Sequence, residues 1–563
     1  MESTEPANGT ALAQSPGKVV LHFDQQVSVS PTSIEVFNAS AKRIDSGSTK
    51  HAPNDSRSVE TAIPTSLPAG GYVVTWRVVS ADSHPVNGAF TFFIGAATGA
   101  GSISAEAGRL LARSAGSRTV GIAYGIVRFL AFVAVAVFLG GVVFATLIWA
   151  EAAEHPRTRR IVWSGLVLLA LTTAAAFALQ GAYGAGLGVG DALKANVLRA
   201  VWDTRFGKSY AARLAFVAVA ALLVPRLWRS RPSPMARAVL LSALGVLGVA
   251  ILATWGVADH ASTGSLVWLA VPFDVVHLGA ASIWLGGLVV AIAVVLPASG
   301  AAAEGTPSPM SVAMPRYSQW ALAAVVAVVA TGVFAAWRQV GVSWGALTTT
   351  SYGKLVLYKT GGLVVLVMIA SVSRTTVHGS LAVPGSRTRT AGGRGRSRPI
   401  GAGARPVGAD VARPSRRSAP ARLRTAIAAE IVVVLAVLAV TAGLVNARPA
   451  NQAYAAPFST EVKAGPTLVD VVVDPAKAGP LAVHLYILTS AGLIDDVPEV
   501  DATMSNPGAG ITGLKVPVQL AGPGHYVAYG FDVPLPGTWT IVVTVRTDAI
   551  DEYFTEPITV RIR

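Results

Sequence analysis

The sequence predicts a multi-domain membrane protein, in which an all-α bundle of about eight transmembrane helices lies between two β-sandwich domains outside the cytoplasm. Three observations predict this fold class. Of the 563 residues, 52% are hydrophobic and only 13% are charged, whereas soluble domains are about a quarter charged. Eight apolar runs are long enough to cross ~30 Å of hydrocarbon. Both ends of the chain show the alternation of half-buried strands.

Residues 1–95 are predicted to form the first sandwich. Tyr72, Val74, Trp76 and Val78 occupy alternate positions, and residues 19–23 and 34–37 repeat this pattern between prolines and glycines that mark turns. Residues 96–118, rich in Ala, Gly, Ser and Arg, are predicted to link this domain to the first span.

The membrane domain is predicted to hold seven spans within residues 119–373 and an eighth at 425–447. Eight spans place both termini on the same side of the membrane. Loops on one side carry 19 Lys and Arg and loops on the other carry 5, and the positive-inside rule therefore puts both termini outside the cytoplasm, at the plasma membrane. The predicted spans are 122–148, 161–187, 211–228, 238–258, 267–296, 318–340, 355–373 and 425–447.

The loop 374–424 contains twelve Arg, no Lys and one acid, so it carries +11 of the formal net charge of +15. Its Arg, Gly, Ser and Pro content predicts a disordered cytoplasmic loop that lies against anionic lipid and fixes orientation. A basic block between apolar spans is a topology signal. The lipid bilayer, and no nucleic acid, is therefore the expected partner.

The second sandwich is predicted at residues 457–563. Its expected strands are 467–473, 482–488, 515–520, 525–531 and 539–546. His484, Met504 and His525 lie in this domain and are weak candidates for a metal site, with Met504 expected in a loop. Scattered surface residues are the simpler interpretation. The domain resembles the FixH/YtkA-like β-domains that are appended to some membrane proteins of the CopD family.

Metal chemistry in this chain has to use His, Asp, Glu or Met, because there is no cysteine. That absence excludes disulfides and thiolate ligands. The six Met are too scattered for a Met-rich site, and imidazole and carboxylate suit a divalent ion such as Cu(II).

The candidate ligands of the first domain are Asp82 and His84. They stand two residues apart just after a strand, so both can point from one edge toward a metal. A solvated turn is the simpler interpretation of so short a pattern. The segment 76–88, with residues 5–9 and the strand 19–23, resembles the periplasmic copper-binding family CopC, and this resemblance implies that Asp82 and His84 bind Cu(II).

One feature departs from the CopC pattern. The family's remaining ligand is a His at the mature N-terminus, whereas this sequence begins Met1-Glu2-Ser3 without that His or a signal peptide. Because the topology requires residues 1–95 to be exported, we expect that the true start lies upstream.

Six short motifs stand out in the membrane domain, at residues 259–261, 274–277, 284–288, 316–318, 331–332 and 352–354. On these motifs the domain resembles the CopD family of copper-resistance proteins, which occurs fused to CopC-like domains.

Asp274 and His277 are the candidate residues within the membrane. They share one face of the fifth span, in its outer half, and ionisable residues in lipid are functional candidates because they are costly there. His260 stands at the outer mouth of the fourth span. The three residues outline a path inward from the outer face. The alternative is structural: His277 bonds to Asp274 or to a neighbouring helix, and His260 caps a helix.

Two patterns repeat at an offset of 146 residues. Residues 138–143 match 284–289, and Thr204-x-Phe206-Gly207-Lys208 matches Thr350-x-Tyr352-Gly353-Lys354. The repeat predicts two parallel four-helix halves. The glycine pairs at 140–141 and 286–287 are expected to allow close helix approach. The offset also places Arg128 opposite Asp274, which suggests a charge pair.

Taken together, the residues and the resemblances predict a copper homeostasis protein that is not an enzyme. Its outer domain would bind Cu(II) and pass it to the bundle for import or delivery, with copper-requiring enzymes or a second copy of the chain as further candidate partners. No G-x-x-x-x-G-K-[ST] sequence is present, so transport would not use the chain's own ATP hydrolysis. The alternatives are a membrane haem or redox protein, or a metal sensor or assembly chaperone that conducts nothing.

Overall fold

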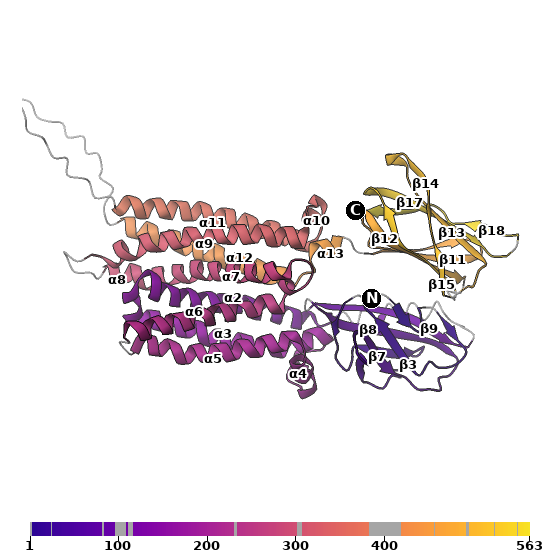
Figure 1. Cartoon of the computed structure of the whole chain (residues 1–563), viewed down its shortest axis with the longest axis horizontal. Coiled ribbons are helices and arrows are strands. Elements are labelled where there is room, and N and C mark those ends of the chain that lie inside the picture. The colour runs from indigo at the N-terminus through magenta and orange to yellow at the C-terminus, as the bar shows by residue number, and fades with distance from the viewer. Residues whose placement is uncertain are drawn as a thin grey trace, which may run out of the picture.

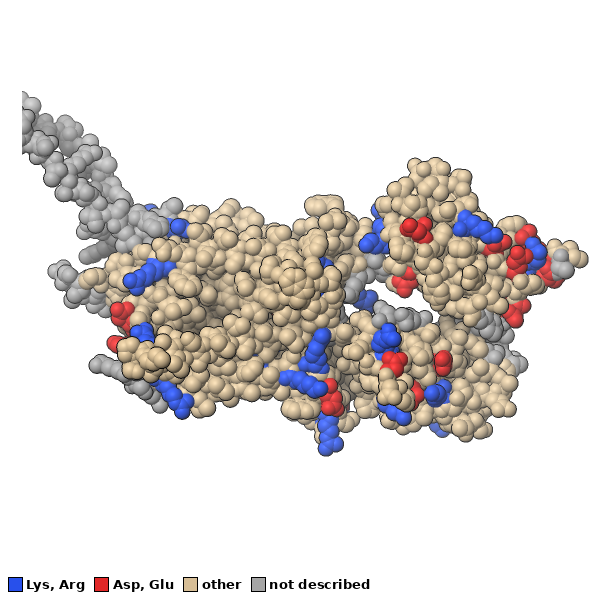
Figure 2. All heavy atoms as spheres, viewed as in Figure 1, with Lys and Arg blue, Asp and Glu red and all other residues tan. Residues whose placement is uncertain are grey.

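The computed structural model contains eight helices that are long and apolar enough to cross a bilayer, with a β-rich domain on either side of them in the chain. This confirms the predicted fold class. Both β-rich domains lie at the same end of the bundle (Figure 1). Charged side chains gather at the two ends of the bundle and on the β-domains, and the visible face between them is uncharged (Figure 2). The structure describes residues 3–563 apart from 9, 24, 82–83, 96–108, 111–115, 230–232, 301–306, 382–417, 455–456, 491–494, 523 and 549.

The N-terminal domain packs two sheets face to face. One has the strand order β1-β3-β7-β6, and the other has the order β2-β9-β8-β4 with β5 also paired to β8. Alternate residues such as Val19, Leu21, Val74 and Phe92 fill the core between the sheets. The strands are β1 Ser3–Glu5, β2 Ala11–Leu12, β3 Lys18–His22, β4 Val27–Ser28, β5 Ile34–Asn38, β6 Thr49–Ala52, β7 Asp55–Ala62, β8 Gly70–Ser80 and β9 Pro85–Ile94.

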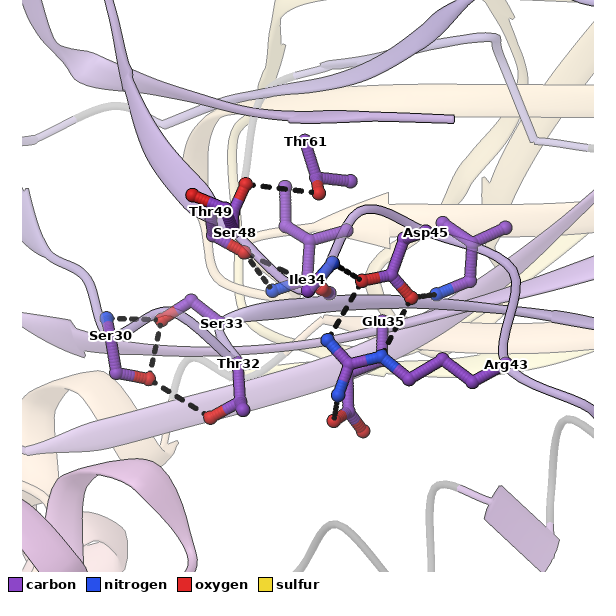
Figure 3. A network of polar contacts seen from close by, with 12 residues as sticks. Ser30, Thr32, Ser33, Ile34, Glu35, Arg43, Asp45, Ser48, Thr49 and Thr61 are labelled. Carbon is purple, nitrogen blue, oxygen red and sulfur yellow. Dashed lines mark hydrogen bonds and ion pairs between the residues drawn. The ribbon is translucent and has the colours of Figure 1, made fainter. Parts of the chain in front are cut away.

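A polar network fixes the turn after β5 (Figure 3). The Arg43 guanidinium donates to Asp45 and to Glu35, and the backbone N–H of Val36 donates to Asp45 Oδ1. Burial opposes ionisation of Asp45, but the hydrogen bonds from Arg43, Val36 and Gly47 outweigh it and hold the pKa of this carboxyl below its usual range. The network stabilises the N-terminal sandwich.

The bundle consists of two similar halves, as the repeat predicts. Gly207 N donates to Thr204 Oγ1, and Gly353 N donates to Thr350 Oγ1, both at 3.0 Å, so the matching motifs begin α5 and α11 in the same way. The first helix of each half ends in a π-helical turn. The first half holds α2 Arg118–Val143, α3 Pro156–Ala185, α4 Ala195–Trp202, α5 Arg205–Arg229 and α6 Pro234–Ala258, and the second holds α7 Val267–Val290, α8 Leu296–Gly300, α9 Pro309–Val340, α10 Trp344–Thr349, α11 Ser351–Leu381 and α12 Ser418–Val445.

The two halves cross at the predicted glycines. A Cβ added to Gly140 would lie 2.1 Å from the backbone oxygen of Ser282 and 2.8 Å from Gly286 Cα. A Cβ added to Gly286 would lie 2.4 Å from the backbone oxygen of Ala136. Helices α2 and α7 therefore touch backbone to backbone, which only glycine permits.

The C-terminal domain also consists of two sheets, and here each has five strands. One has the order β10-β11-β12-β16-β15, and the other has the order β14-β13-β17-β18 with β19 also paired to β17. A short helix, α13 Ala450–Tyr454, precedes it. The strands are β10 Phe458–Ala464, β11 Thr467–Asp474, β12 Gly479–Thr489, β13 Glu499–Asn506, β14 Ile511–Val516, β15 Gln519–Gly522, β16 His525–Val533, β17 Gly537–Arg546, β18 Glu552–Phe554 and β19 Ile558–Ile562.

Candidate functional site

The long strand β8 brings the first domain onto the membrane bundle. Arg77, near the end of β8, donates from Nε to the Gly184 carbonyl at 2.8 Å and from Nη2 to the Tyr183 carbonyl at 3.0 Å, both at the end of α3. Arg205, at the start of α5, donates to the Ala81 carbonyl. These contacts seat the first domain on the first half of the bundle.

His84 itself contacts the second half of the bundle. Its Nε2 lies 3.1 Å from the carbonyl oxygen of Val445, the last residue of α12. A carbonyl only accepts, so Nε2 carries the hydrogen, and in the neutral ring the lone pair is on Nδ1. Asp82 lies outside the described residues.

Arg128 of α2 shares the same carbonyl. Its Nη1 donates to the Val445 oxygen at 3.2 Å, and its Nη2 donates to Asp259 Oδ1 at 3.3 Å and to the Tyr124 hydroxyl at 3.1 Å. The suggested pairing of Arg128 with Asp274 is therefore wrong. The repeat offset identifies equivalent positions in the two halves, and equivalent positions need not be in contact. Asp259, which directly follows α6, is the carboxylate that bonds to the Arg128 guanidinium.

His277 bonds to a neighbouring helix and faces a cation. Its Nδ1 lies 2.9 Å from Thr331 Oγ1 of α9. The Thr331 hydroxyl already donates to the Ala327 carbonyl, so the imidazole donates here and its lone pair is on Nε2. That nitrogen lies 3.5 Å from Nζ of Lys359 on α11. A lone pair aimed at an ammonium is also suited to a metal cation.

Asp274 lies one turn before His277 on α7. A Cβ on Gly256 would lie 3.2 Å from Asp274 Oδ2, so the carboxylate packs against α6 where that helix carries glycine. Asp259 and Lys359 are its charged neighbours. Asp259, Asp274, Lys359 and His277 thus form a polar track that descends from the contact of His84 and Arg128 into the bundle.

His260 was the third candidate in this region. Its backbone forms a short 3-10 turn, His260–Ser262, after α6 and beside Asp259. This agrees with its expected place at the mouth of the fourth span. Its side chain lies outside the described residues.

Glu430 is a buried carboxylate that the sequence analysis missed. It lies on α12, is 3% exposed, and accepts a hydrogen bond of 2.6 Å from the Ser373 hydroxyl as well as one from the Trp284 side chain. A cavity of about 180 Å³ adjoins it and is also lined by Tyr317 and Arg374. The signal was present, because Glu430 is a lone acid within an apolar span.

In the C-terminal domain, Met504 is in a strand and not in the expected loop. It lies in β13 at an inward position with Val500 and Ala502 and is 0% exposed. The thioether fills the hydrophobic core, so Met504 is not a ligand available at the surface.

The other two C-terminal candidates do come together. His484 Nδ1 on β12 lies 3.1 Å from His525 Nε2 on β16, on the outer face of the sheet. Burial lowers the pKa of His484, and burial together with the neighbouring His484 lowers the pKa of His525 to about 4. Both rings are therefore neutral at pH 7, and one donates its N–H to the other.

A metal ion can also be bound by a cluster of several His, Asp or Glu side chains at once. Within the part of the chain that the structure describes, no group of three or more His, Asp or Glu is placed to hold a metal. The candidate groups lie instead on different elements: Asp259 follows α6, Asp274 and His277 are on α7, and Lys359 is on α11.

Three family models match the chain. A CopC domain matches residues 1–95, the N-terminal domain of a copper resistance protein D-like family matches 119–268, and copper resistance protein D matches 311–444. Residues 457–563 lie beyond these matches, so the FixH/YtkA resemblance stays a prediction.

Two similar proteins are copper proteins by name. Copper transport protein CutJ of Bacillus subtilis (strain 168) is 26% identical over 374 residues, and the match spans 66% of this chain and 66% of that protein. Copper resistance protein C of Escherichia coli is 33% identical over 100 residues, which are 17% of this chain and 79% of that protein.

Among solved structures, CopC from Methylosinus trichosporium OB3b is 27% identical and PcoC, a methionine rich copper resistance protein from Escherichia coli, is 28% identical. Each match covers 17% of this chain, and 91% and 96% of those chains respectively, with a TM-score of 0.15. The chain belongs to the CopC and CopD copper-resistance families, as a CopC domain joined to a CopD-type multi-pass membrane domain.

Proposed function

We propose that this protein binds Cu(II) outside the cytoplasm on its CopC domain and passes copper to the membrane bundle, which moves it inward across the plasma membrane. The observation that carries the proposal is the shared Val445 carbonyl. His84 and Arg128 both bond to it, and Arg128 also donates to Asp259, so the proposed copper ligand lies beside the start of the polar track. The names of the relatives, copper transport protein CutJ and copper resistance protein C, support copper as the substrate.

The chemistry of the outer site follows from the tautomer of His84. Because His84 donates its Nε2–H to the Val445 carbonyl, copper would bind this ring through Nδ1. A histidine ligand whose other nitrogen donates to a carbonyl is fixed in orientation and is a better base. The same hydrogen bond ties the copper ligand to the end of α12, and loss of copper from the outer domain then occurs at the mouth of the bundle.

Within the bundle, we propose that copper replaces the ammonium of Lys359 as the cation beside His277. The Asp259 and Asp274 carboxylates attract a cation at the mouth, and His277 Nε2 and Asp274 supply nitrogen and oxygen ligands. Displacement of the Lys359 ammonium removes one positive charge from the site as the ion enters. Further inward, the Glu430 carboxylate offers the next acceptor, beside Trp284 and Ser373.

The orientation of the chain supports inward movement from the outer domain. Both β-domains lie at one end of the bundle, whereas α11 ends and α12 begins at the opposite end, on either side of the Arg-rich segment in the sequence (Figure 1). By the positive-inside rule the loop is cytoplasmic, and the domains and both termini are therefore outside. Delivery of copper to an enzyme at the outer face, or to a second copy of the chain, would use the same outer site without the inner track.

The outer site is tested by exchanging Asp82 and His84 for Ala in the full chain. We expect Cu(II) affinity at this site to fall by at least ~100-fold, because even second-shell partners of a metal contribute ~10–100-fold. The measurement is Cu(II) titration in detergent, with electron paramagnetic resonance to detect the nitrogen ligand. His155→Ala, at the opposite end of the bundle, is the control. Unchanged Cu(II) binding in the Asp82→Ala/His84→Ala protein would contradict the proposal.

A further inference from the structure

We propose that His484 and His525 of the C-terminal domain bind one monovalent copper ion in a linear, two-coordinate site. This inference concerns residues beyond the ranges of the matching family models. It is independent of whether the bundle transports copper, because the pair lies on the outer face of a β-sheet.

The sheet register brings the two histidines together. Tyr486 stands directly opposite His525, and His484 is two residues before Tyr486 on β12, so the two imidazoles are diagonal neighbours on one face. The inward-facing neighbours Val483 and Leu485 fill the core, whereas His484 is half-buried at the surface. The two histidines are thus outside the hydrophobic core that stabilises the sandwich.

The geometry of the pair suits a linear metal bridge. The nitrogens are 3.1 Å apart, the ring centroids are 5.4 Å apart, and the ring planes differ by 14°. The nitrogens therefore face each other along the line that joins the rings. Metal–nitrogen bonds of ~2.0 Å would place the nitrogens about 4 Å apart. The rings need to separate by only about 0.9 Å, and the open outer face of the sheet allows this movement.

The surroundings of the pair favour a weakly hydrated cation. The Tyr486 ring stacks on His525 with 4.4 Å between centroids and 10° between planes. The Tyr529 ring stands at 88° to His484, at 5.7 Å. An irregularity in the β12–β16 register occurs beside Tyr529, and such bulges re-aim side chains. Aromatic faces stabilise a nearby cation.

Two neutral imidazoles are too few ligands for the other metals that favour nitrogen. Zinc sites in proteins use three or four protein ligands. Among the residues described around this sheet, no third His, Asp or Glu completes such a set. Monovalent copper has a filled d shell and is satisfied by two opposed nitrogen ligands. When the ion binds, the ring that donates the shared N–H takes up a proton on its other ring nitrogen and releases the shared one. Both rings stay neutral, and the two facing nitrogens present lone pairs to the ion.

The test uses the full-length chain with Asp82→Ala, His84→Ala and His277→Gln, which removes both ligands of the outer site and the imidazole ligand proposed within the bundle. Monovalent copper is titrated anaerobically against a chromophoric chelator. We expect one bound ion, and we expect the affinity to fall by at least 100-fold when His484→Gln and His525→Gln are added. The matched control adds His22→Gln and His155→Gln, and should retain the ion.

X-ray absorption of the copper-loaded protein that retains the pair gives a second, independent result. Two nitrogen ligands in a linear arrangement are expected. Three results would overturn the proposal: a spectrum with three or more ligands, binding of Cu(II) without binding of monovalent copper, or an unchanged affinity for monovalent copper when His484 and His525 are replaced. Because this spectrum does not need the variant that lacks His484 and His525, the test stands even if that variant unfolds. Copper uptake is not measured here, so failure of the inference and failure of the transport proposal are distinguishable.

Discussion

Replacing Asp274 with Asn and His277 with Gln in the same chain is expected to abolish copper uptake by cells. The double substitution removes the carboxylate and the only imidazole of the track whose ring position the structure describes within the membrane. It leaves the helix apolar enough to insert. We expect the rate of copper accumulation to fall by at least ~100-fold, since losing even an outer-shell partner of a metal ligand costs ~10–100-fold in affinity.

The matched control carries the same chemical changes away from the track. Asp191→Asn lies in the loop after α3, where Asp191 pairs with Lys194, and His155→Gln lies before α3. We expect this control to accumulate copper normally. Equal cellular copper in the two double variants and the wild type would mean that the track does not conduct. Delivery at the outer face would then be the function that remains.

Replacing Gly140 with Leu is expected to prevent assembly of the bundle. The first side-chain carbon would lie 2.1 Å from the Ser282 backbone oxygen, and backbone cannot move aside as a flexible side chain can. Overpacking usually costs ~1–3 kcal/mol, and a clash with backbone is the extreme case. We expect no monodisperse protein by gel filtration in detergent, or a large fall in the temperature of unfolding.

Gly245→Leu is the control for this effect. Gly245 is exposed on α6, and a Cβ there meets nothing within 4 Å. Both substitutions add the same apolar side chain and both favour membrane insertion, so a difference between them reports helix packing alone. If the two variants were equally stable, the close crossing of α2 and α7 at Gly140 and Gly286 would be refuted.

The sequence was most informative where one physical rule dominates. Hydrophobic thickness predicts the eight spans, and alternation predicts the strands 525–531 and 539–546, which the structure contains within β16 and β17. The small residues of the repeat predicted close contact between two helices, and Gly140 and Gly286 make that contact.

Contacts between distant residues were harder to predict, because they depend on register and on helix ends. Arg128 bonds to Asp259 because α6 ends beside it, which the repeat offset could not reveal. The strand β13 was not predicted, and Met504 was therefore assigned to a loop. The meeting of His484 with His525 required the register of β12 on β16.

The central claim is that water and copper reach His277 from the outer face, and one cysteine tests it. The sequence has no cysteine, so any thiol labelling that is measured comes from the single introduced cysteine. A Cβ on Gly332 would lie 3.5 Å from His277 Cε1, an ordinary contact, and Gly332→Cys therefore fits. Gly361→Cys, where a Cβ meets nothing within 4 Å on α11, is the lipid-facing control.

The measurement is the reaction of these thiols with a charged, membrane-impermeant reagent added outside intact cells, followed by copper uptake. Our account predicts that Gly332→Cys reacts and that uptake then stops, while Gly361→Cys stays unmodified. A Gly332→Cys thiol that reacts only from the cytoplasmic side, or whose modification leaves copper uptake unchanged, would contradict it.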